Sequence, residues 1–390
     1  MDPELRFPES EYRERARRVR DEMARRSIDV LLVLSPPNLC YLTGFESVWY
    51  PSRAPVGCVL ARSGDTVVFV DYERHASLVD ATALADDAIF YRYETAIDTL
   101  VEAFRVRGWL DGTVGIEWHT TTPSGPLVQE IARRLGEAGA TVVSGDWTVD
   151  RVRLVKSAAE LERVERASAI VDAAFQAIPG FVRPGMSELE IAARIDLEMA
   201  QRGGEEPAVR TMVSAGPAVW CRTHGAPSRR PVERGDVMYV DACGVVDRYH
   251  VDVCRTYAIG ADSPRAREIL DHTAQSVELV RRGVTVGDSL DVAVQIAEQH
   301  VHERFGSEHV WWIGGYALGI ALPPSWVGHV YLSNDSYEAF SWEPGYLTNY
   351  ENILFDRERQ VTASYMETLL MTPNGIRILS QVPRGLTVIE

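Results

Sequence analysis

The chain has 390 residues, of which 46% are hydrophobic and 25% are charged, as is usual for a globular enzyme. This length exceeds what one ordinary hydrophobic core supports, so two domains are expected. The formal net charge of −16 argues against nucleic acid or an anionic membrane as the partner, because both attract basic surfaces.

The first residues carry no apolar signal core, and no segment approaches the roughly 18 consecutive apolar residues of a membrane-spanning helix. The five cysteines have no metal-type spacing, and an odd number of cysteines suits a reducing compartment. We therefore expect a cytoplasmic protein.

The first 150 residues alternate helix and strand patterns. A basic amphipathic helix at 11–26 precedes an apolar strand at 29–34. The other expected elements are strands at 55–60, 65–70 and 113–117 and helices at about 96–107 and 125–138. This alternation predicts an α/β domain. No phosphate-binding glycine fingerprint follows any of these strands, so no nucleotide site is expected.

A domain boundary is expected near Val152–Lys156, which gives domains 1–153 and 154–390. Ser157 and Glu160 then form a capping box that opens a long helix. The second half reads as two related units, each with two helices followed by strands. An internal duplication would bring the strands of both units to one site on a pseudo-twofold axis.

The strands of each unit carry two carboxylates in a hairpin pattern. In the first hairpin, a turn centred on Val246 and Asp247 would pair Asp241 directly with Asp252. In the second hairpin, a loop centred on Arg359 would set Glu351 opposite Glu367. Because like charges directly opposite on a ladder are destabilising, two such pairs call for a cation, shared protons or a cationic substrate.

Over nearly the whole chain, the order and spacing of these residues resemble the pita-bread family, which includes creatinase, prolidase, aminopeptidase P and methionine aminopeptidase. The segment 38–44, after the first strand, is similar to a signature of that family. The resemblance implies an α/β N-terminal domain and an α+β pita-bread C-terminal domain with an internal pseudo-twofold duplication. It also implies a substrate-side histidine at His224. The metal ligands that it implies are Asp241, Asp252, Glu351 and Glu367.

The chain departs from the family at two histidines. Tyr316 occupies the place of the metal-binding histidine, and Pro323 occupies the place of a second one. With the Pro323–Trp326 segment, these replacements look more like the creatinase-like and ectoine-hydrolase-like branch than the true peptidases. The resemblance implies that members of this branch can work without metal.

Two versions of the chemistry therefore stay open. In the first, one divalent ion (Mn, Fe or Mg) held by Asp241, Asp252 and Glu367 generates hydroxide. In the second, the site is free of metal and the carboxylates bind a cationic substrate. His224 is then the general acid and base, and Asp241 or a water that it activates is the nucleophile. In either version Tyr316 contacts the site and is expected to donate a hydrogen bond as a neutral phenol.

Further residues are expected to bind substrate. His250 lies two residues before Asp252 and would share its face, and Trp326 would form a pocket wall. In creatinase-like dimers a loop such as 49–53 reaches the partner's active site. The resemblance therefore implies a homodimer with three specificity residues in that loop, namely Trp49, Tyr50 and Arg53.

The predicted function is hydrolysis of an amide, amidine or peptide-like C–N bond in a small polar, cationic molecule, as in creatinase. Three alternatives stay open. These are a metal-dependent Xaa-Pro dipeptidase or aminopeptidase, a lyase acting on a small polar metabolite, and a ligand-binding homologue without activity.

Overall fold

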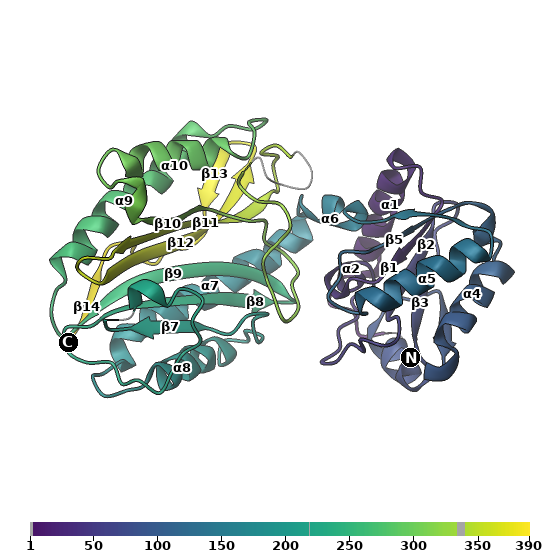
Figure 1. The fold of residues 1–390 in the computed structure, drawn as a ribbon, viewed down its shortest axis with the longest axis horizontal. Coiled ribbons are helices and arrows are strands. Elements are labelled where there is room, and N and C mark those ends of the chain that lie inside the picture. Colours follow the sequence, from purple (N-terminus) through teal and green to yellow (C-terminus); the bar gives the residue numbers. More distant parts are fainter. Residues whose placement is uncertain (1–2, 218, 334–339) are drawn as a thin grey trace. The chain divides into compact units, whose positions relative to one another are not determined.

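The computed structural model describes residues 3–217, 219–333 and 340–390. The chain divides into two compact units, Met1–Arg153 and Leu154–Glu390 (Figure 1). Among the described residues, no helix has the length and apolar character needed to cross a membrane.

The first unit is built on a six-stranded sheet with the strand order β4-β3-β2-β1-β5-β6. Its strands are β1 (Val30–Val33), β2 (Gly57–Ala61), β3 (Val67–Tyr72), β4 (Asp87–Tyr91), β5 (Thr113–Ile116) and β6 (Thr141–Ser144). Its helices are α1 (Glu9–Arg25), α2 (Pro36–Thr43), α3 (Ala76–Thr82), α4 (Ala96–Val106), α5 (Gly125–Glu137) and α6 (Thr148–Arg153). The predicted strands and helices of this half all form. Strands β4 and β6 escaped prediction; they are the partly exposed edges of the sheet, and both are short.

The segment 38–44 has a structural role in this unit. It lies on α2, whose start is held by the buried carboxylate of Glu117. Glu117 accepts hydrogen bonds from the backbone N–H groups of Leu34 and Ser35 at 2.8 and 2.7 Å and from the Asn38 amide at 2.6 Å. Gly44 ends the helix in the left-handed conformation that glycine favours, with φ of 79°. The contacts of Asn38 at the start of α2 and the conformation of Gly44 at its end explain why these two residues stand six positions apart in the segment 38–44.

The second unit contains an eight-stranded sheet, in which β10-β11-β12-β9-β8-β7 are neighbours in that order. Its strands are β7 (Met212–Ala215), β8 (Val237–Val246), β9 (Tyr249–Ile259), β10 (Val310–Gly314), β11 (Leu347–Asp356), β12 (Val361–Thr372), β13 (Gly375–Ile378) and β14 (Thr387–Ile389). Its helices are α7 (Ala158–Phe181), α8 (Glu188–Ala200), α9 (Pro264–Gly283) and α10 (Val292–His302). Two helices followed by three strands occur twice, and the two halves meet between β9 and β12. This arrangement is the predicted internal duplication.

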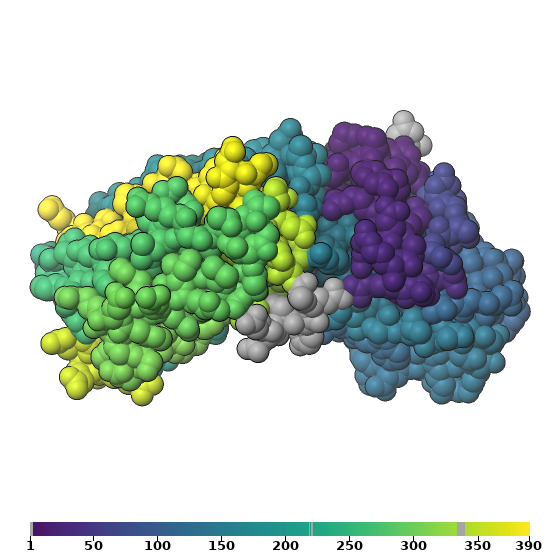
Figure 2. Space-filling view, turned by 90° about the horizontal axis from the view of Figure 1, so that it is seen from above, coloured from purple at the N-terminus to yellow at the C-terminus, as the bar shows by residue number. Residues whose placement is uncertain are grey.

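The four helices pack against one face of this sheet. Helix α7 lies so close to β8 that a Cβ atom on Gly244 would stand 2.2 Å from the carbonyl oxygen of Ala167. Helices α9 and α10 cover the second half and form an outer surface of this unit, shown in green in Figure 2. The core beneath them includes Leu270, Val277, Leu354, Tyr365 and Leu369. The other face of the sheet is left for the candidate site.

The seam between the two halves is held in part by threonine side chains. β9 and β12 meet in register at Cys254 and Met366. On one side of this pair, the Thr368 hydroxyl donates to the Asp252 carbonyl and accepts from the Asp252 N–H, both at 2.9 Å. On the other side, Thr256 makes the same pair of bonds to the backbone of Ser364 at 2.8 and 3.0 Å. Hydroxyl groups thus replace ladder bonds next to the site.

We predict that Thr368→Val destabilises the second unit by about 1–3 kcal/mol, because it leaves a buried N–H and a buried C=O of Asp252 unpaired. Urea unfolding measures this free energy. Thr362→Val is the matched control on the same strand, since the buried Thr362 hydroxyl has no hydrogen-bond partner among the described residues. A Thr368→Val cost no larger than that of Thr362→Val would contradict the prediction.

Candidate active site

The first carboxylate hairpin has a two-residue turn. Asp247 and Arg248 form the turn with φ of 49° and 66°, and Val246 pairs with Tyr249. As a result Asp241 lies opposite Cys254, and Asp252 lies opposite Cys243. The predicted direct pairing of Asp241 with Asp252 is therefore wrong, because the turn is centred one residue later. The two carboxylates still share one face of the sheet, as diagonal neighbours.

The second hairpin has a four-residue loop. Asp356 pairs with Val361, and the Asp356 carboxylate accepts the Arg359 N–H at 2.9 Å within the loop. Glu351 is consequently opposite Met366, and Glu367 is opposite Tyr350. The predicted pairing of Glu351 with Glu367 is wrong. A register difference of one residue sends the two glutamates to opposite faces.

Glu367 lies on the helix-covered face, away from the other three carboxyl groups. Its Oε1 accepts hydrogen bonds from the guanidinium groups of Arg255 and Arg384, both at 2.8 Å. Arg255 also donates to the backbone carbonyls of Val382 and Pro383. This network ties the C-terminal segment to the sheet, so Glu367 contributes to packing and does not join the predicted ligand set.

Asp241, Asp252 and Glu351 are buried together on the helix-free face. Burial raises the pKa of Asp241, and the neighbouring Asp252 and Glu351 raise it further. Burial also raises the pKa of Asp252, and it raises that of Glu351 to about 8. Near neutral pH the three groups therefore hold protons between them instead of three negative charges.

Asn349 and Tyr316 are polar neighbours of these acids. The Asn349 amide donates to Asp252 at 3.2 Å and to Glu351, and its carbonyl oxygen accepts the Tyr316 N–H at 2.7 Å. The Tyr316 side chain lies close enough to Glu351 to lower the pKa of that carboxyl, against the larger effect of burial. Burial and the nearby carboxyls raise the pKa of Tyr316 well above its ordinary value, so it is a neutral phenol. Sequence reasoning missed Asn349, although its position two residues before Glu351 on a strand places both on one face.

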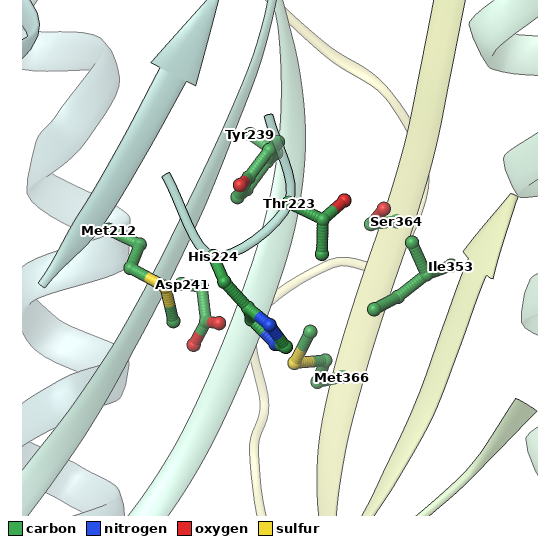
Figure 3. A pocket seen from close by; sticks show the side chains of 8 residues that line it. All are labelled: Met212, Thr223, His224, Tyr239, Asp241, Ile353, Ser364 and Met366. Carbon is green, nitrogen blue, oxygen red and sulfur yellow. The ribbon is translucent and has the colours of Figure 1, made fainter. Parts of the chain in front are cut away.

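His224 and Asp241 line the same small pocket, a cavity of about 10 Å³. Figure 3 shows the two side chains reaching into it from a loop and from β8, with the Met366 thioether beside them. The remaining lining residues are Met212, Thr223, Tyr239, Ile353 and Ser364. The His224 ring packs edge-on against Trp311 with centroids 5.3 Å apart. The structure thus brings together the histidine and the aspartate that the resemblance implied.

The loop that carries His224 is held in place by an ion pair between Arg222 and Glu188. Arg222 donates two hydrogen bonds to the buried carboxylate of Glu188, at 2.8 and 3.0 Å. The Arg222 carbonyl accepts the Gly225 N–H at 2.8 Å, and His224 between them takes a left-handed φ of 62°. A bidentate ion pair to a buried acid therefore holds the position of the candidate acid and base.

His250 and Trp326 do not line this pocket. Both ring nitrogens of His250 are used, since Nδ1 contacts the Arg248 carbonyl at 2.8 Å and Nε2 accepts the Ala208 N–H at 3.0 Å. Burial lowers the pKa of His250 to about 3, so the ring is neutral. The Trp326 indole N–H donates to the Tyr316 hydroxyl at 3.0 Å.

The three predicted specificity residues of the first unit lie in or beside an exposed loop. Trp49 is 53% exposed and touches His75, with ring centroids 6.3 Å apart. Tyr50 packs edge-on against Phe45, also at 6.3 Å, and Arg53 is exposed. Their contribution to substrate selection stays a prediction.

The donor set does not fit the divalent metal centre that the resemblance implies. Within the described residues, no group of three or more His, Cys, Asp or Glu side chains is arranged to hold a metal ion. The side chain from β12 that faces the acids is the thioether of Met366, a poor ligand for hard ions such as Mg²⁺ or Mn²⁺. Tyr316 offers a protonated phenol where a histidine nitrogen would stand.

The fold and this site define a two-domain hydrolase of the pita-bread class. Residues 162–378 match metallopeptidase family M24, and residues 15–155 match the creatinase/prolidase N-terminal domain. The chain therefore belongs to metallopeptidase family M24, whose members typically use divalent metal ions. This confirms the resemblance and the fold class predicted from the sequence.

Similar proteins include both hydrolase types considered above. The chain is 26% identical to an ectoine hydrolase of Halomonas elongata, with 98% of each chain covered. It is 23% identical to an Xaa-Pro dipeptidase of Pyrococcus horikoshii, with 96% of this chain and 98% of the relative covered. Among solved structures, dipeptidase PepE of Mycobacterium ulcerans has a TM-score of 0.85 at 20% identity, with 98% and 99% covered.

We predict that Glu351→Gln stabilises the protein, and more so at pH 8.5 than at pH 5. The pKa of Glu351 is about 8 in the folded chain and lies near its ordinary value when unfolded. Its contribution to stability is therefore fully present at low pH and is lost as the pH rises through 8. Glutamine does not titrate, so the gain in Tm should be larger at the higher pH by on the order of 10 °C.

Differential scanning fluorimetry at the two pH values measures this difference in Tm. Glu358→Gln, on the exposed loop of the same hairpin, is the control and should show no pH-dependent gain. A Glu351→Gln gain that is equal at both pH values would show that the carboxyl does not titrate as inferred.

Proposed function

We propose that this M24 hydrolase cleaves an amide or amidine C–N bond in a small cationic molecule without a metal ion. The observation that carries this proposal is the shared pocket of His224 and Asp241, backed by the buried carboxyls of Asp252 and Glu351. Such a pocket combines a general base with a layer of acids that favours positive charge.

The charge of the substrate follows from desolvation. Asp241 Oδ1 is buried and has no hydrogen-bond partner among the described residues. An amidinium, guanidinium or ammonium group at this position would provide both a donor and a compensating charge, which favours the ionised carboxylate.

The walls of the pocket indicate the character of the substrate. The cavity itself is only about 10 Å³, which is room for about one water molecule. The side chains of Met212, Ile353 and Met366 make part of the wall apolar. We infer a substrate that carries a short alkyl group beside its cationic end.

The chemistry then needs one water molecule. His224 takes a proton from water while the water oxygen attacks the carbon of the C–N bond, and Asp241 binds the cationic nitrogen. His224 returns the proton to the leaving nitrogen as the C–N bond breaks. An amide yields an acid and an amine, and an amidine yields an amide and an amine.

The names of the relatives support hydrolysis of this bond type but differ in substrate. We favour the branch of the ectoine hydrolase over that of the Xaa-Pro dipeptidase, because Tyr316 and Met366 supply no metal ligand of the usual kind. The proposal includes a homodimer in which the loop that carries Trp49, Tyr50 and Arg53 selects substrate. The 53% exposure of the Trp49 side chain is compatible with such a contact.

The first test of the function is product analysis with a substrate panel in ¹⁸O-labelled water. The panel contains acetamidine, guanidino acids, N-acetyl diamines and Xaa-Pro dipeptides, each with and without Mn²⁺. We expect one labelled oxygen in the product of a cationic amide or amidine. Asp241→Asn and His224→Gln should each lower kcat by about 10²–10⁴-fold.

Glu367→Gln is the control, since this carboxyl lies on the opposite face and should leave kcat within about threefold while lowering stability. An Asp241→Asn variant with full turnover would refute the proposal. An unlabelled alkene product would indicate a lyase, and peptide cleavage that depends on Mn²⁺ would indicate a dipeptidase.

The second test is metal analysis. Protein purified without chelator, incubated with Mn²⁺ and desalted should retain far less than one ion per chain, and its activity should resist EDTA. The double variant Tyr316→His, Met366→Glu is the positive control, because it adds a nitrogen and a carboxylate ligand beside the three acids. One tightly bound ion per wild-type chain, with activity lost to chelator, would overturn the metal-free proposal.

A further inference from the structure

We propose that Trp311 is a positioning residue that holds the imidazole ring of His224 in the orientation needed for proton transfer. This inference deepens the proposed function and rests on it for its catalytic consequence. The Trp311 indole packs edge-on against the His224 ring, with centroids 5.3 Å apart and an angle of 86° between the ring planes. Trp311 lies on β10, at one edge of the second sheet, whereas His224 lies in the loop before β8. The contact therefore joins the two halves of this unit beside the pocket.

A β-bulge in β10 sets the direction of the Trp311 side chain. On the neighbouring strand β11, Ile353 pairs with Trp312. The next residue, Leu354, pairs with Val310, so Trp311 is an extra residue that the ladder leaves out. In a regular ladder Trp311 would lie opposite Leu354 and point toward the helix-covered face. Val310 occupies that position and packs against the core beneath the helices. The bulge thus releases Trp311 from the helix-covered face.

The neighbours of Trp311 show that it is turned to the face that carries the acids. Its ring lies 5.3 Å from that of His224 and 6.3 Å from that of Phe355. Phe355 is two residues beyond Ile353, which lines the pocket, so both side chains project from the same face. His309 holds the chain just before the bulge, because its Nδ1 donates to the Phe355 carbonyl at 3.0 Å. Bulges beside active sites commonly re-aim one side chain, and here that side chain meets the candidate base.

The His224 ring depends on this contact for its orientation. A histidine that acts as a base is usually oriented by a hydrogen bond from its second ring nitrogen. In the part of the chain that the structure describes, neither ring nitrogen of His224 has such a partner. The left-handed backbone of His224 fixes where the side chain begins, but the ring would still turn about its own bonds. The Trp311 indole restricts that rotation and leaves both nitrogens available to water and to substrate.

The contact is tested by NMR without any substrate, on protein with ¹³C-labelled histidine rings. The chain has nine histidines, and His224→Gln identifies the signals of His224 by their loss. Spectra are recorded at pH 9, above the ordinary histidine pKa of about 6.5, so that changes of protonation do not move the signals. Trp311→Leu should move the His224 ring signals toward those of an unfolded peptide, because the indole no longer shields or restrains the ring.

Two variants serve as controls for this measurement. Trp311→Phe keeps an aromatic ring and should preserve most of the shift. Trp118→Leu removes another tryptophan of similar exposure, 38% against 42% for Trp311, and should leave the His224 signals in place. Because Trp311 is this exposed, its replacement should leave the signals of the other histidines unchanged, which shows that the fold is intact. Unmoved His224 signals in Trp311→Leu would refute the proposal.

The positioning role is tested by a double-mutant cycle on a substrate found in the panel. Trp311→Leu should lower kcat about 10–100-fold, as for a displaced catalytic group, with KM changed less than about threefold. Trp311→Phe should keep kcat within about threefold of the wild type. In the His224→Gln background, Trp311→Leu should have no further effect on kcat. Additive effects would overturn the proposal. A change in KM alone would also overturn it, and would show that the indole binds substrate instead.

The two measurements separate the possible failures. If the panel yields no substrate, the proposed function fails, while the NMR signals still decide whether the indole orients the His224 ring. If turnover is found and the cycle is additive, the function stands and the positioning role is refuted. Thermal unfolding of each variant identifies any loss of kcat that comes from misfolding.

Discussion

Three carboxyl groups buried at one seam constrain the rest of this structure. Asp241, Asp252 and Glu351 are buried on one face, and charge repulsion adds to the cost of desolvation. The protein limits this cost in two ways. The groups retain protons, and the Asn349 amide donates hydrogen bonds to Asp252 and Glu351. One oxygen, Oδ1 of Asp241, is left without a partner among the described residues, and Asp241 lines the pocket.

The duplicated architecture is what makes this concentration of acids possible. Each half contributes a long hairpin, and the halves meet where Thr256 and Thr368 substitute hydroxyl groups for ladder bonds. Asp241 and Asp252 come from one half and Glu351 from the other, so neither half contains the complete set. Because all four helices cover the opposite face, the acids lie on the side of the sheet that carries His224, where Asp241 lines the pocket.

The sequence patterns predicted the elements and the duplication, but they could not predict which acids meet. The difference lies in the turns. In the first hairpin a centre misplaced by one residue shifts the pairing by two positions, which leaves Asp241 and Asp252 on one face. In the second a centre misplaced by half a residue shifts the pairing by one position, which exchanges Glu367 for Met366. Only the loop geometry decides this, through the hydrogen bond from Arg359 to Asp356. The same β11–β12 register places the Asn349 amide beside Asp252 and Glu351, so its hydrogen bonds to them could not be predicted either.

The two side chains Tyr316 and Met366 act on the acids in the same direction. Tyr316 and Met366 are neutral side chains at the positions that face the acids, and both reduce the ability of the site to hold a metal ion. Without a metal ion, the carboxyls Asp241, Asp252 and Glu351 would make the protein less stable unless something else compensates them. A cationic substrate would do so at the moment it binds. On this view the desolvation that destabilises the free site is also the source of its preference for positive charge, which is why the acids persist after the metal ligands have changed.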